Sequence, residues 1–469
     1  MIRYYLSHAL LPLVFFISCE KSVSEKDSPG PLRNSTDHPG YFTDDSGKAI
    51  YLTGAHTWNN LVDMVADETD EVFDYPEYMT WMKQRNYNFF RLWAWELMNW
   101  DTRGNNETEA RVLQVFPHPW KRTGPGNALD GKPKFDLGTY DEDYFERLKE
   151  RVGMAGESGI YVAVMLFEGW GLQFSPNAFE NHPFHPGNNI NEVNGDTDGD
   201  GSGIEIHTLG NERVMAIQEA YVRKVIETVN ESDFVLYEIA NECHPSSTDW
   251  QYHMINLIRK LEKEMPKQHP VGMTFQYKGG SNQALFESPA DWISPNPENG
   301  YRDDPPARHD SKAVITDTDH LWGIGGNSTW VWKSFLRGLN PIFMDPYDQR
   351  VLSGSYDPEW VEPLRKSLGY SRQIADSINL TYMVPDTVIS SSAYCLADQG
   401  EAFLVFLPDT VTVSVDLEKI QGIFECSWFD PSNGEFSQAE VRDGGEILVM
   451  TTPFNTRDNV LYLKKLDHE

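Results

Sequence analysis

The chain has 469 residues, of which 40% are hydrophobic and 13% aromatic, so it can bury one large core and a smaller second core. Aspartate and glutamate number 71 against 39 lysines and arginines, which gives a formal net charge of −32. This balance argues against nucleic acid as a partner, because phosphates require a basic surface. It favours a neutral or cationic ligand, or simply a soluble surface.

The first residues have the pattern of a targeting segment. Arg3 precedes an apolar run over 9–17, and residues 16–19, Phe-Ile-Ser-Cys, resemble a bacterial lipobox. Residues 1–19 are therefore predicted to be a lipoprotein signal peptide with Cys19 as the lipidated residue; an ordinary secretory signal is the alternative. The run is too short to span a bilayer, so we expect a bacterial cell-envelope protein, at the cell surface or in the periplasm, that contacts the membrane only through its lipid.

Residues 20–37 are polar with proline and glycine, which predicts a flexible tether. After this tether, predicted strands and helices alternate over 38–379. The first predicted strand ends near Gly54, and the others cover 88–93, 160–167, 234–240, 270–277, 291–294, 313–316 and 341–344. The predicted helices cover 75–85, 143–158, 211–230, 250–265, 329–339 and 358–378.

This alternation indicates right-handed βαβ units, and about eight of them fit a (β/α)8 TIM barrel better than an open sheet. The sequence has no glycine-rich dinucleotide fingerprint after the first strand, which disfavours a Rossmann fold. Residues 380–469 instead contain short alternating apolar runs separated by turn residues. They predict a small antiparallel β-sandwich, so the fold class is α/β with a barrel followed by this second domain.

Polar side chains gather where the predicted barrel strands end. An apolar core of residues 234–237 with Ile239 and Ala240 stops at Asn241-Glu242, and parallel barrels carry their catalytic groups at such strand ends. Other polar and aromatic residues at or just after the ends of the predicted strands are His56, Trp58, Arg91, Trp93, Trp95, Glu168, Trp170, His244, Tyr277, Asp317, Asp319, His320 and Asp345.

Paired carboxylates beside aromatic rings suit a sugar, whose C–H faces stack on indoles while its hydroxyls form hydrogen bonds. Glycosidic cleavage needs one carboxylic acid and one carboxylate. Glu242 is the candidate acid/base and Asp317 the candidate nucleophile or water-activating base, with Asp319 and Asp345 as rivals; the remaining residues are candidates for substrate binding. Each also has a structural alternative: Arg91 would neutralise a core carboxylate, and the tryptophans and histidines would pack in the core.

Asn241-Glu242, Arg91 and a carboxylate after the seventh strand resemble clan A glycoside hydrolases, the cellulase-like (β/α)8 group. The resemblance implies that Glu242 is the acid/base, that Asn241 contacts a sugar hydroxyl and that Arg91 supports the nucleophile. In addition, residues 391–395 and 428–434 resemble the C-terminal β-domain that carries a collagen-binding label in bacterial glycosidases of the apiosidase-like type. The family nucleophile is usually glutamate, whereas Asp317 is one methylene shorter, so both retention and inversion remain open.

The chemistry requires no cofactor, but Asp196, Asp198 and Asp200 alternate with glycines like the first half of a calcium loop. A structural calcium ion is one interpretation and a solvated acidic loop the other. Cys395 and Cys426 are too few for a disulfide framework and are expected as buried thiols. The sequence therefore predicts a glycosidase acting on a polysaccharide or oligosaccharide, with a non-catalytic glycan-binding lipoprotein as the alternative and a lyase or esterase as a weaker third.

Overall fold

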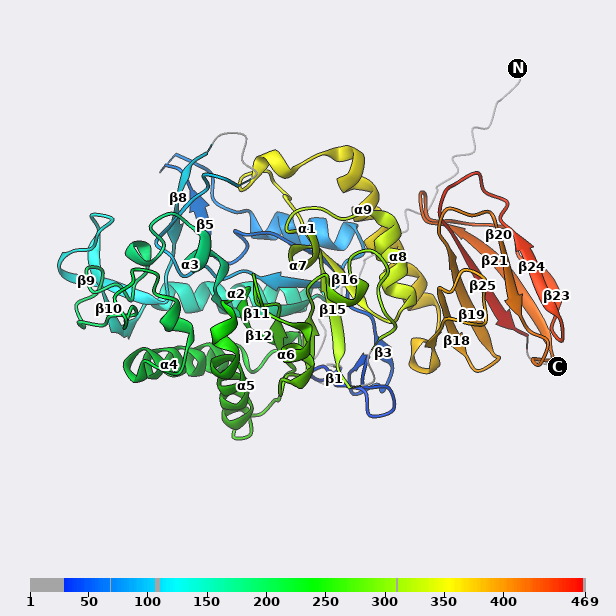
Figure 1. The fold of residues 1–469 in the computed structure, drawn as a ribbon, viewed down its shortest axis with the longest axis horizontal. Helices are drawn as coiled ribbons and strands as arrows, with labels where there is room; N and C mark the ends of the chain where they lie inside the picture. Colours follow the sequence, from blue (N-terminus) through cyan, green and yellow to red (C-terminus); the bar gives the residue numbers. More distant parts are fainter. Residues whose placement is uncertain (1–28, 68, 106–109, 309–310, 467–469) are drawn as a thin grey trace, which may run out of the picture.

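The computed structural model describes residues 29–67, 69–105, 110–308 and 311–466. Eight parallel strands form one sheet with the order β4-β16-β15-β14-β13-β12-β11-β6. Their bounds are β4 Gly54–His56, β6 Phe89–Leu92, β11 Tyr161–Glu168, β12 Val235–Asn241, β13 Val271–Thr274, β14 Trp292–Ser294, β15 Ala313–Asp317 and β16 Asn340–Met344. The backbone N–H groups of Asn88 and Phe89 donate to the carbonyl of Thr53, which joins the two ends of the sheet. The predicted (β/α)8 barrel is thus confirmed (Figure 1).

Most helices around the barrel begin at a polar residue whose side chain caps the first turn, and the long ones bury one face. Asn211 accepts a hydrogen bond from the N–H of Val214 at the start of α4, and α5 buries Trp250, Met254 and Ile258 at helical spacing. The α-helices are α1 Tyr75–Gln84, α2 Glu142–Glu157, α3 Trp170–Phe174, α4 Glu212–Val229, α5 Thr248–Glu262, α6 Asn282–Glu287, α7 Thr318–Trp322, α8 Ser328–Leu336 and α9 Pro358–Ser377. Short 3-10 turns are η2 Phe179–Asn181, η3 Ile204–His207, η4 Pro245–Ser247, η5 Glu298–Gly300, η6 Ser353–Ser355 and η7 Leu380–Tyr382.

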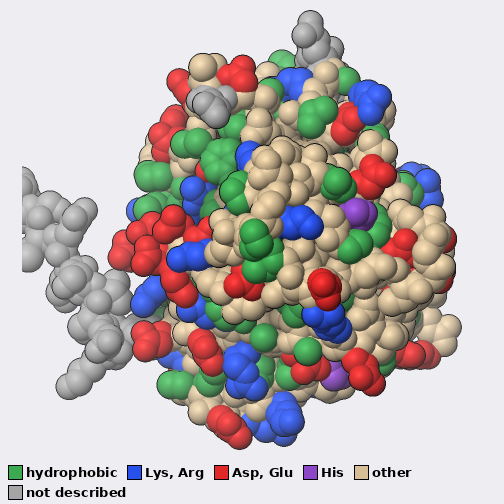
Figure 2. All heavy atoms as spheres, turned by 90° about the vertical axis from the view of Figure 1, so that its left-hand side faces the viewer, with side chains coloured by type: hydrophobic (Ala, Val, Ile, Leu, Met, Phe, Trp, Pro, Cys, Tyr) green, Lys and Arg blue, Asp and Glu red, His purple; other side chains and the backbone are tan. Residues whose placement is uncertain are grey.

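Long excursions from the strand ends carry small sheets that the sequence analysis treated as loops. Strands β5 Asp63–Val65, β7 Asn99–Asp101 and β8 Val112–Phe116 form an antiparallel sheet, and β9 Trp120–Asn127 pairs with β10 Pro133–Tyr140. Figure 1 places β9 and β10 at the end of the molecule farthest from the C-terminal domain. On the face that Figure 2 shows, hydrophobic side chains are scattered among charged and other polar groups.

The C-terminal region forms two antiparallel sheets, as predicted. The larger has the order β17-β18-β19-β25-β21-β22 with β23 on β21, and the smaller pairs β20 with β24. The bounds are β17 Val384–Asp386, β18 Cys395–Asp398, β19 Ala402–Leu407, β20 Thr412–Asp416, β21 Ile423–Asp430, β22 Glu435–Phe436, β23 Glu440–Asp443, β24 Ile447–Thr451 and β25 Asn459–Lys465. Cys395 and Cys426 are buried free thiols between the sheets. Trp332 of α8 packs against Phe406 and Phe429, which joins the barrel to this domain.

Strands β1 Arg33–Asn34, β2 Phe42–Thr43 and β3 Ala49–Ile50 precede the barrel. The structure differs from the flexible tether predicted over 20–37 at Leu32. This side chain is 1% exposed and packs with Phe42 and Phe89 at the base of the barrel. This burial and the pairing of β1 with β2 hold residues 32–34 against the barrel. The predicted signal peptide and Cys19 lie outside the described residues. Among the described residues, no helix is long and apolar enough to cross a membrane.

Candidate active site

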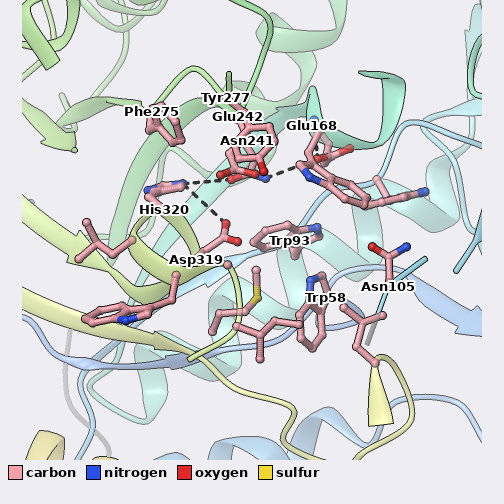
Figure 3. Close-up of a pocket in the computed structure, with 18 of the residues that line it drawn as sticks. Trp58, Trp93, Asn105, Glu168, Asn241, Glu242, Phe275, Tyr277, Asp319 and His320 are labelled. Atoms are coloured by element: carbon pink, nitrogen blue, oxygen red, sulfur yellow. Dashed lines mark hydrogen bonds and ion pairs between the residues drawn. The ribbon is translucent and has the colours of Figure 1, made fainter. Parts of the chain in front are cut away.

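A cavity of about 540 Å³ opens at the carboxyl ends of the barrel strands, a size typical of small-molecule sites. Six tryptophans and three carboxylates stand in its lining: Trp58, Trp93, Trp95, Trp100, Trp170 and Trp322, with Glu168, Glu242 and Asp319. Figure 3 shows Asp319 beside the ring of Trp93, Glu242 beside Asn241, and a dashed line from Asn241 to Glu168. The predicted residues Trp58, Trp93, Trp95, Glu168, Trp170, Asn241, Glu242, Tyr277, Asp319 and His320 all line this cavity.

Arg91 of β6 lies below the cavity and is 1% exposed. It donates two hydrogen bonds to Glu238, at 2.8 and 2.6 Å, and one each to Asp317 at 2.9 Å, Asn241 at 2.7 Å and Asp319 at 3.2 Å. Burial disfavours its charge, but these carboxylates, Glu238 first, hold the pKa of Arg91 above its usual value. The two interpretations of Arg91 are therefore compatible, because it neutralises a core carboxylate and also fixes the site above it.

Asp317 is the last residue of β15, is fully buried and does not line the cavity. One carboxylate oxygen lies 2.8 Å from His56 Nε2, and its oxygens also accept from Arg91 and from the backbone N–H of Asp319 at 3.0 Å. Burial alone would raise the pKa of Asp317, but His56 and Arg91 hold it well below its usual range. His56 also stacks on Trp93 with ring centroids 5.5 Å apart. Asp317 is thus an ionised carboxylate below the cavity that binds His56, Arg91 and the backbone of Asp319.

Asn241 ends β12 and has its amide fixed from both sides. Its Oδ1 accepts from Arg91 and from His320 Nε2 at 3.2 Å, while its Nδ2 lies 3.4 Å from Glu168. Glu242 follows with a φ of 45°, a left-handed conformation that is uncommon for a residue with a side chain and often marks functional sites. This turn of the backbone places the carboxyl of Glu242 in the cavity wall, where the residue is 5% exposed.

Glu242 and Asp319 form a pair across the cavity: one carboxyl oxygen of each lies within 4.8 Å of the other. Burial, and next the charge of Asp319, raise the pKa of Glu242 well above its usual value. Burial also raises the pKa of Asp319, but Arg91 opposes the shift by donating to it. Because the guanidinium favours an ionised Asp319, we place the proton on Glu242. The site then offers one carboxylic acid and one carboxylate.

Glu168 ends β11 and is the third carboxylate of the cavity. It is 1% exposed and accepts hydrogen bonds from the backbone N–H groups of Trp170 at 2.9 Å and Gly171 at 2.8 Å. Burial raises the pKa of Glu168 to about 7, although these hydrogen bonds oppose the shift.

Behind Glu168, Glu96 connects several segments. Its carboxylate accepts from the N–H of Glu168 at 2.9 Å, lies 2.9 Å from His207 and lies 3.4 Å from His182. Burial would raise its pKa, but His207 and His182 lower the pKa of Glu96 to about 2. His207 in turn contacts Cys243, which follows Glu242. The network therefore supports the wall from which Glu168 and Glu242 project.

His320 lies in the cavity wall with Glu242 and Asp319, and the three offer ligand atoms within 4.8 Å of one another. This spacing is compatible with a divalent metal, but the hydrogen bonds are not. His320 Nε2 faces Asn241 Oδ1, which only accepts, so Nε2 carries the hydrogen and has no lone pair for a metal. Burial lowers the pKa of His320 to about 3, which keeps the ring neutral, and Nδ1 lies 2.7 Å from Ser294 Oγ.

Four predicted substrate-binding residues do not line the cavity: Arg91 and His56, which lie below it, and His244 and Asp345, which have other contacts. His244 caps η4, with its Nδ1 at 2.8 Å from Ser246 Oγ. Asp345 is 1% exposed and accepts two hydrogen bonds from Arg365 of α9, at 2.5 and 2.8 Å. The side chains of His244 and Asp345 are thus occupied by structural contacts.

Four residues of the site were not predicted from the sequence: Glu238, Trp100, Phe275 and Arg302. Glu238 had a signal, because a carboxylate inside an apolar strand needs a buried partner. The other three line the cavity from segments after β6, β13 and β14 without any pattern that marks them.

The carboxylates of Asp196, Asp198 and Asp200 offer oxygens within 4.8 Å of one another, as oxygen ligands of calcium would. Asp196 also accepts from the backbone N–H groups of Gly199 and Gly201, at 2.8 and 2.9 Å. The loop is therefore ordered by its own hydrogen bonds, and calcium binding stays a prediction.

Two family models match parts of the chain. The model described as "Domain of unknown function (DUF6298)" matches residues 66–278, and the model described as "Putative collagen-binding domain of a collagenase" matches residues 381–464. The second match agrees with the predicted resemblance of the C-terminal domain. None of the curated protein sequences compared matches the chain.

Solved structures of low sequence identity are similar over nearly the whole chain. One described as "Glycoside hydrolase" has a TM-score of 0.60 and 13% identity, covering 93% of this chain and 97% of its own. A glycoside hydrolase family 5 structure from Bacteroides vulgatus ATCC 8482 has a TM-score of 0.61 and 13% identity, covering 93% and 94%. At this identity the likeness shows the fold, a (β/α)8 barrel of the type seen in glycoside hydrolases.

Proposed function

We propose that this chain is a glycoside hydrolase in which Glu242 is the general acid and Asp319 the second catalytic carboxylate. One observation carries the proposal: the two carboxyl groups face each other within 4.8 Å in a tryptophan-lined cavity at the carboxyl ends of the barrel strands. The indoles offer flat apolar faces to sugar rings. The fold shared with structures described as glycoside hydrolases supports the same conclusion.

The separation favours a retaining mechanism, because retaining enzymes hold their carboxyl groups about 5–5.5 Å apart and inverting enzymes about 6.5–9.5 Å apart. Glu242 gives its proton to the glycosidic oxygen while Asp319 attacks the anomeric carbon. The bond to the leaving sugar breaks, and a glycosyl ester of Asp319 forms. Glu242, now ionised, removes a proton from water, which attacks the same carbon and releases Asp319.

In this mechanism Asp317 does not take the role of nucleophile that the sequence suggested. Its oxygens are bound by His56, Arg91 and the N–H of Asp319, and it does not line the cavity. We assign it a positioning role, since it holds the start of α7 and therefore the carboxylate of Asp319.

The test combines variants with product stereochemistry. Glu242→Gln and Asp319→Asn should each lose activity on natural glycans while keeping the fold, and proton NMR should show retention in the wild type. With an activated aryl glycoside, azide should rescue Glu242→Ala with net retention and Asp319→Ala with inversion. A fully active Glu242→Gln would contradict the proposal that Glu242 is the general acid. Tight glycan binding by a wild type that cleaves none of a broad glycan panel would favour the binding-protein alternative.

We also propose that the chain is tethered to the cell envelope through a lipid on Cys19. The lipobox-like Phe-Ile-Ser-Cys after an apolar run supports this. Radiolabelled palmitate should enter the full-length protein expressed in bacteria and should be absent from Cys19→Ala. Equal labelling of both proteins would exclude the anchor.

A further inference from the structure

The buried carboxylates of the barrel differ in one respect that points to a ligand. Six in the described part of the chain are at most 2% exposed, and five of these have a basic partner. The five pairs are Asp63 with Arg147, Glu238 and Asp317 with Arg91, Glu262 with His269, and Asp345 with Arg365. Glu168 is the sixth, and no ion pair to it exists among the described residues. A buried charge without a partner costs several kcal/mol.

The contacts of Glu168 supply donors but no charge. The N–H groups of Trp170 and Gly171 donate to its two oxygens, and the amide of Asn241 lies 3.4 Å away. Such donors stabilise a carboxylate without neutralising it. Glu168 can therefore accept one more hydrogen bond, and a positively charged donor would complete the site as arginine does for Asp63, Glu238, Asp317 and Asp345.

The position of Glu168 limits what that donor can be. Glu168 lines the same cavity as Glu242 and Asp319. The side chain of Asn241 contacts Glu168, and Glu242 is the next residue of the chain after Asn241 (Figure 3). Of the three carboxyl groups in the lining, Glu242 holds the proton and Asp319 accepts from Arg91. The lining contains one lysine or arginine, Arg302, which is 45% exposed and pairs with Asp303, so the charge of Glu168 is left unbalanced. The cavity therefore attracts cations, and so does a chain with a net charge of −32.

We propose that Glu168 binds the ammonium group of the substrate, so that the preferred substrates are glycosides of amino sugars with a free amine. This inference rests on the proposed glycosidase function. The ammonium donates to a carboxylate oxygen of Glu168 on the sugar that lies beside Glu242. An N-acetyl group or a hydroxyl at the same carbon has no charge, so neither replaces this contact. A charge-assisted hydrogen bond of this kind contributes about 10- to 100-fold in affinity.

The experiment measures binding to the full chain near neutral pH by calorimetry. The probes are a hexosamine, its N-acetyl derivative and the parent hexose, in both the gluco and the galacto series. We expect one hexosamine to bind at least about 10-fold more tightly than its two uncharged relatives. Glu168→Gln should abolish this preference. Glu146→Gln, which removes an exposed carboxylate from α2, should leave it intact.

The proposal is overturned if no hexosamine binds more tightly than its parent hexose, which includes the case without any binding. It is also overturned if the preference persists in Glu168→Gln. If thermal unfolding shows that this variant does not fold, the wild-type comparison decides alone. Hydrolysis of neutral glycosides that depends on Glu242, without a hexosamine preference, would leave the glycosidase proposal standing and remove only the amino-sugar specificity. A hexosamine preference in a protein that hydrolyses no glycoside would keep the binding of an ammonium group by Glu168 and remove the glycosidase proposal.

Discussion

Asp317 and Asp319 are two residues apart, and their replacement by asparagine should have opposite consequences. Asp317→Asn removes a fully buried charge that contacts both His56 and Arg91. Asp319→Asn removes a carboxylate that lines the cavity and has one 3.2 Å contact with Arg91. Asp317→Asn should mainly lower the free energy of unfolding, whereas Asp319→Asn should mainly lower kcat.

The contacts give the magnitudes. Breaking a buried ion pair costs about 3–5 kcal/mol, and we expect about 3 kcal/mol for Asp317→Asn because Arg91 keeps its two bonds to Glu238. Loss of the single Arg91 contact in Asp319→Asn should cost about 1 kcal/mol, offset in part by relief of its repulsion with Glu242. Removal of a nucleophile lowers kcat by about 10⁴-fold or more, whereas misplacement of one lowers it by about 10²-fold.

The assay pairs urea unfolding with steady-state hydrolysis of an aryl glycoside for the wild type and both variants. Asp319→Asn should unfold near the wild-type midpoint and be almost inactive. Asp317→Asn should unfold at lower urea and keep a measurable rate. If Asp319→Asn retains a tenth of the wild-type rate while Asp317→Asn is stable and inactive, the assignment is wrong and Asp317 is the nucleophile.

Glu168, Glu96 and the loop at Asp196 each give a further test. The charge of Glu168 helps to raise the pKa of Glu242, and the rate of hydrolysis should fall as pH rises past that pKa. Glu168→Gln should therefore shift the basic side of the pH–rate profile to lower pH. A profile that does not shift would exclude this effect of Glu168 on Glu242. The pKa of Glu96 is lowered from 4.5 to about 2, so its contribution of about 3 kcal/mol should be present above pH 4.5 and lost as pH falls toward 2. Urea unfolding against pH should therefore show a smaller loss in Glu96→Gln than in the wild type, and identical curves would contradict this. Millimolar calcium should raise the unfolding temperature of the wild type and not of Asp196→Asn; without stabilisation the calcium prediction falls.

The barrel could be predicted because each of its strands is buried on both faces and each helix buries one. The run from Phe234 to Ala240 predicted β12 to within one residue at its start, and the predicted helix over 143–158 overlies α2 at Glu142–Glu157. The sheet of β5, β7 and β8 was not predicted. Its strands are three to five residues long, too short for a period-two pattern to be distinguished from a loop.

The sequence predicted residues of the candidate site better than it predicted the contacts between them. Strand ends identified Asn241, Glu242 and Arg91, because parallel strands bring their carboxyl ends to one edge. The partners of Arg91 could not be read from the sequence, since Glu238 and Asp317 lie 147 and 226 residues away from it. Which long-range pair forms depends on register and inward orientation around the closed barrel, and single-sequence patterns do not encode either directly.

The distinction between Asp317 and Asp319 depends on where a strand becomes a helix. Two residues apart on a continuing strand, both side chains would point to the same face and be equivalent candidates. Instead β15 ends at Asp317, whose carboxylate caps α7 by accepting from the N–H of Asp319, and α7 begins at Thr318. Asp317 therefore stays in the barrel interior, while the first helical turn places Asp319 in the cavity wall facing Glu242. The end of the strand at Asp317, together with the contacts of its carboxylate with His56 and Arg91, thus separates two identical side chains, and of the two Asp319 alone lines the cavity.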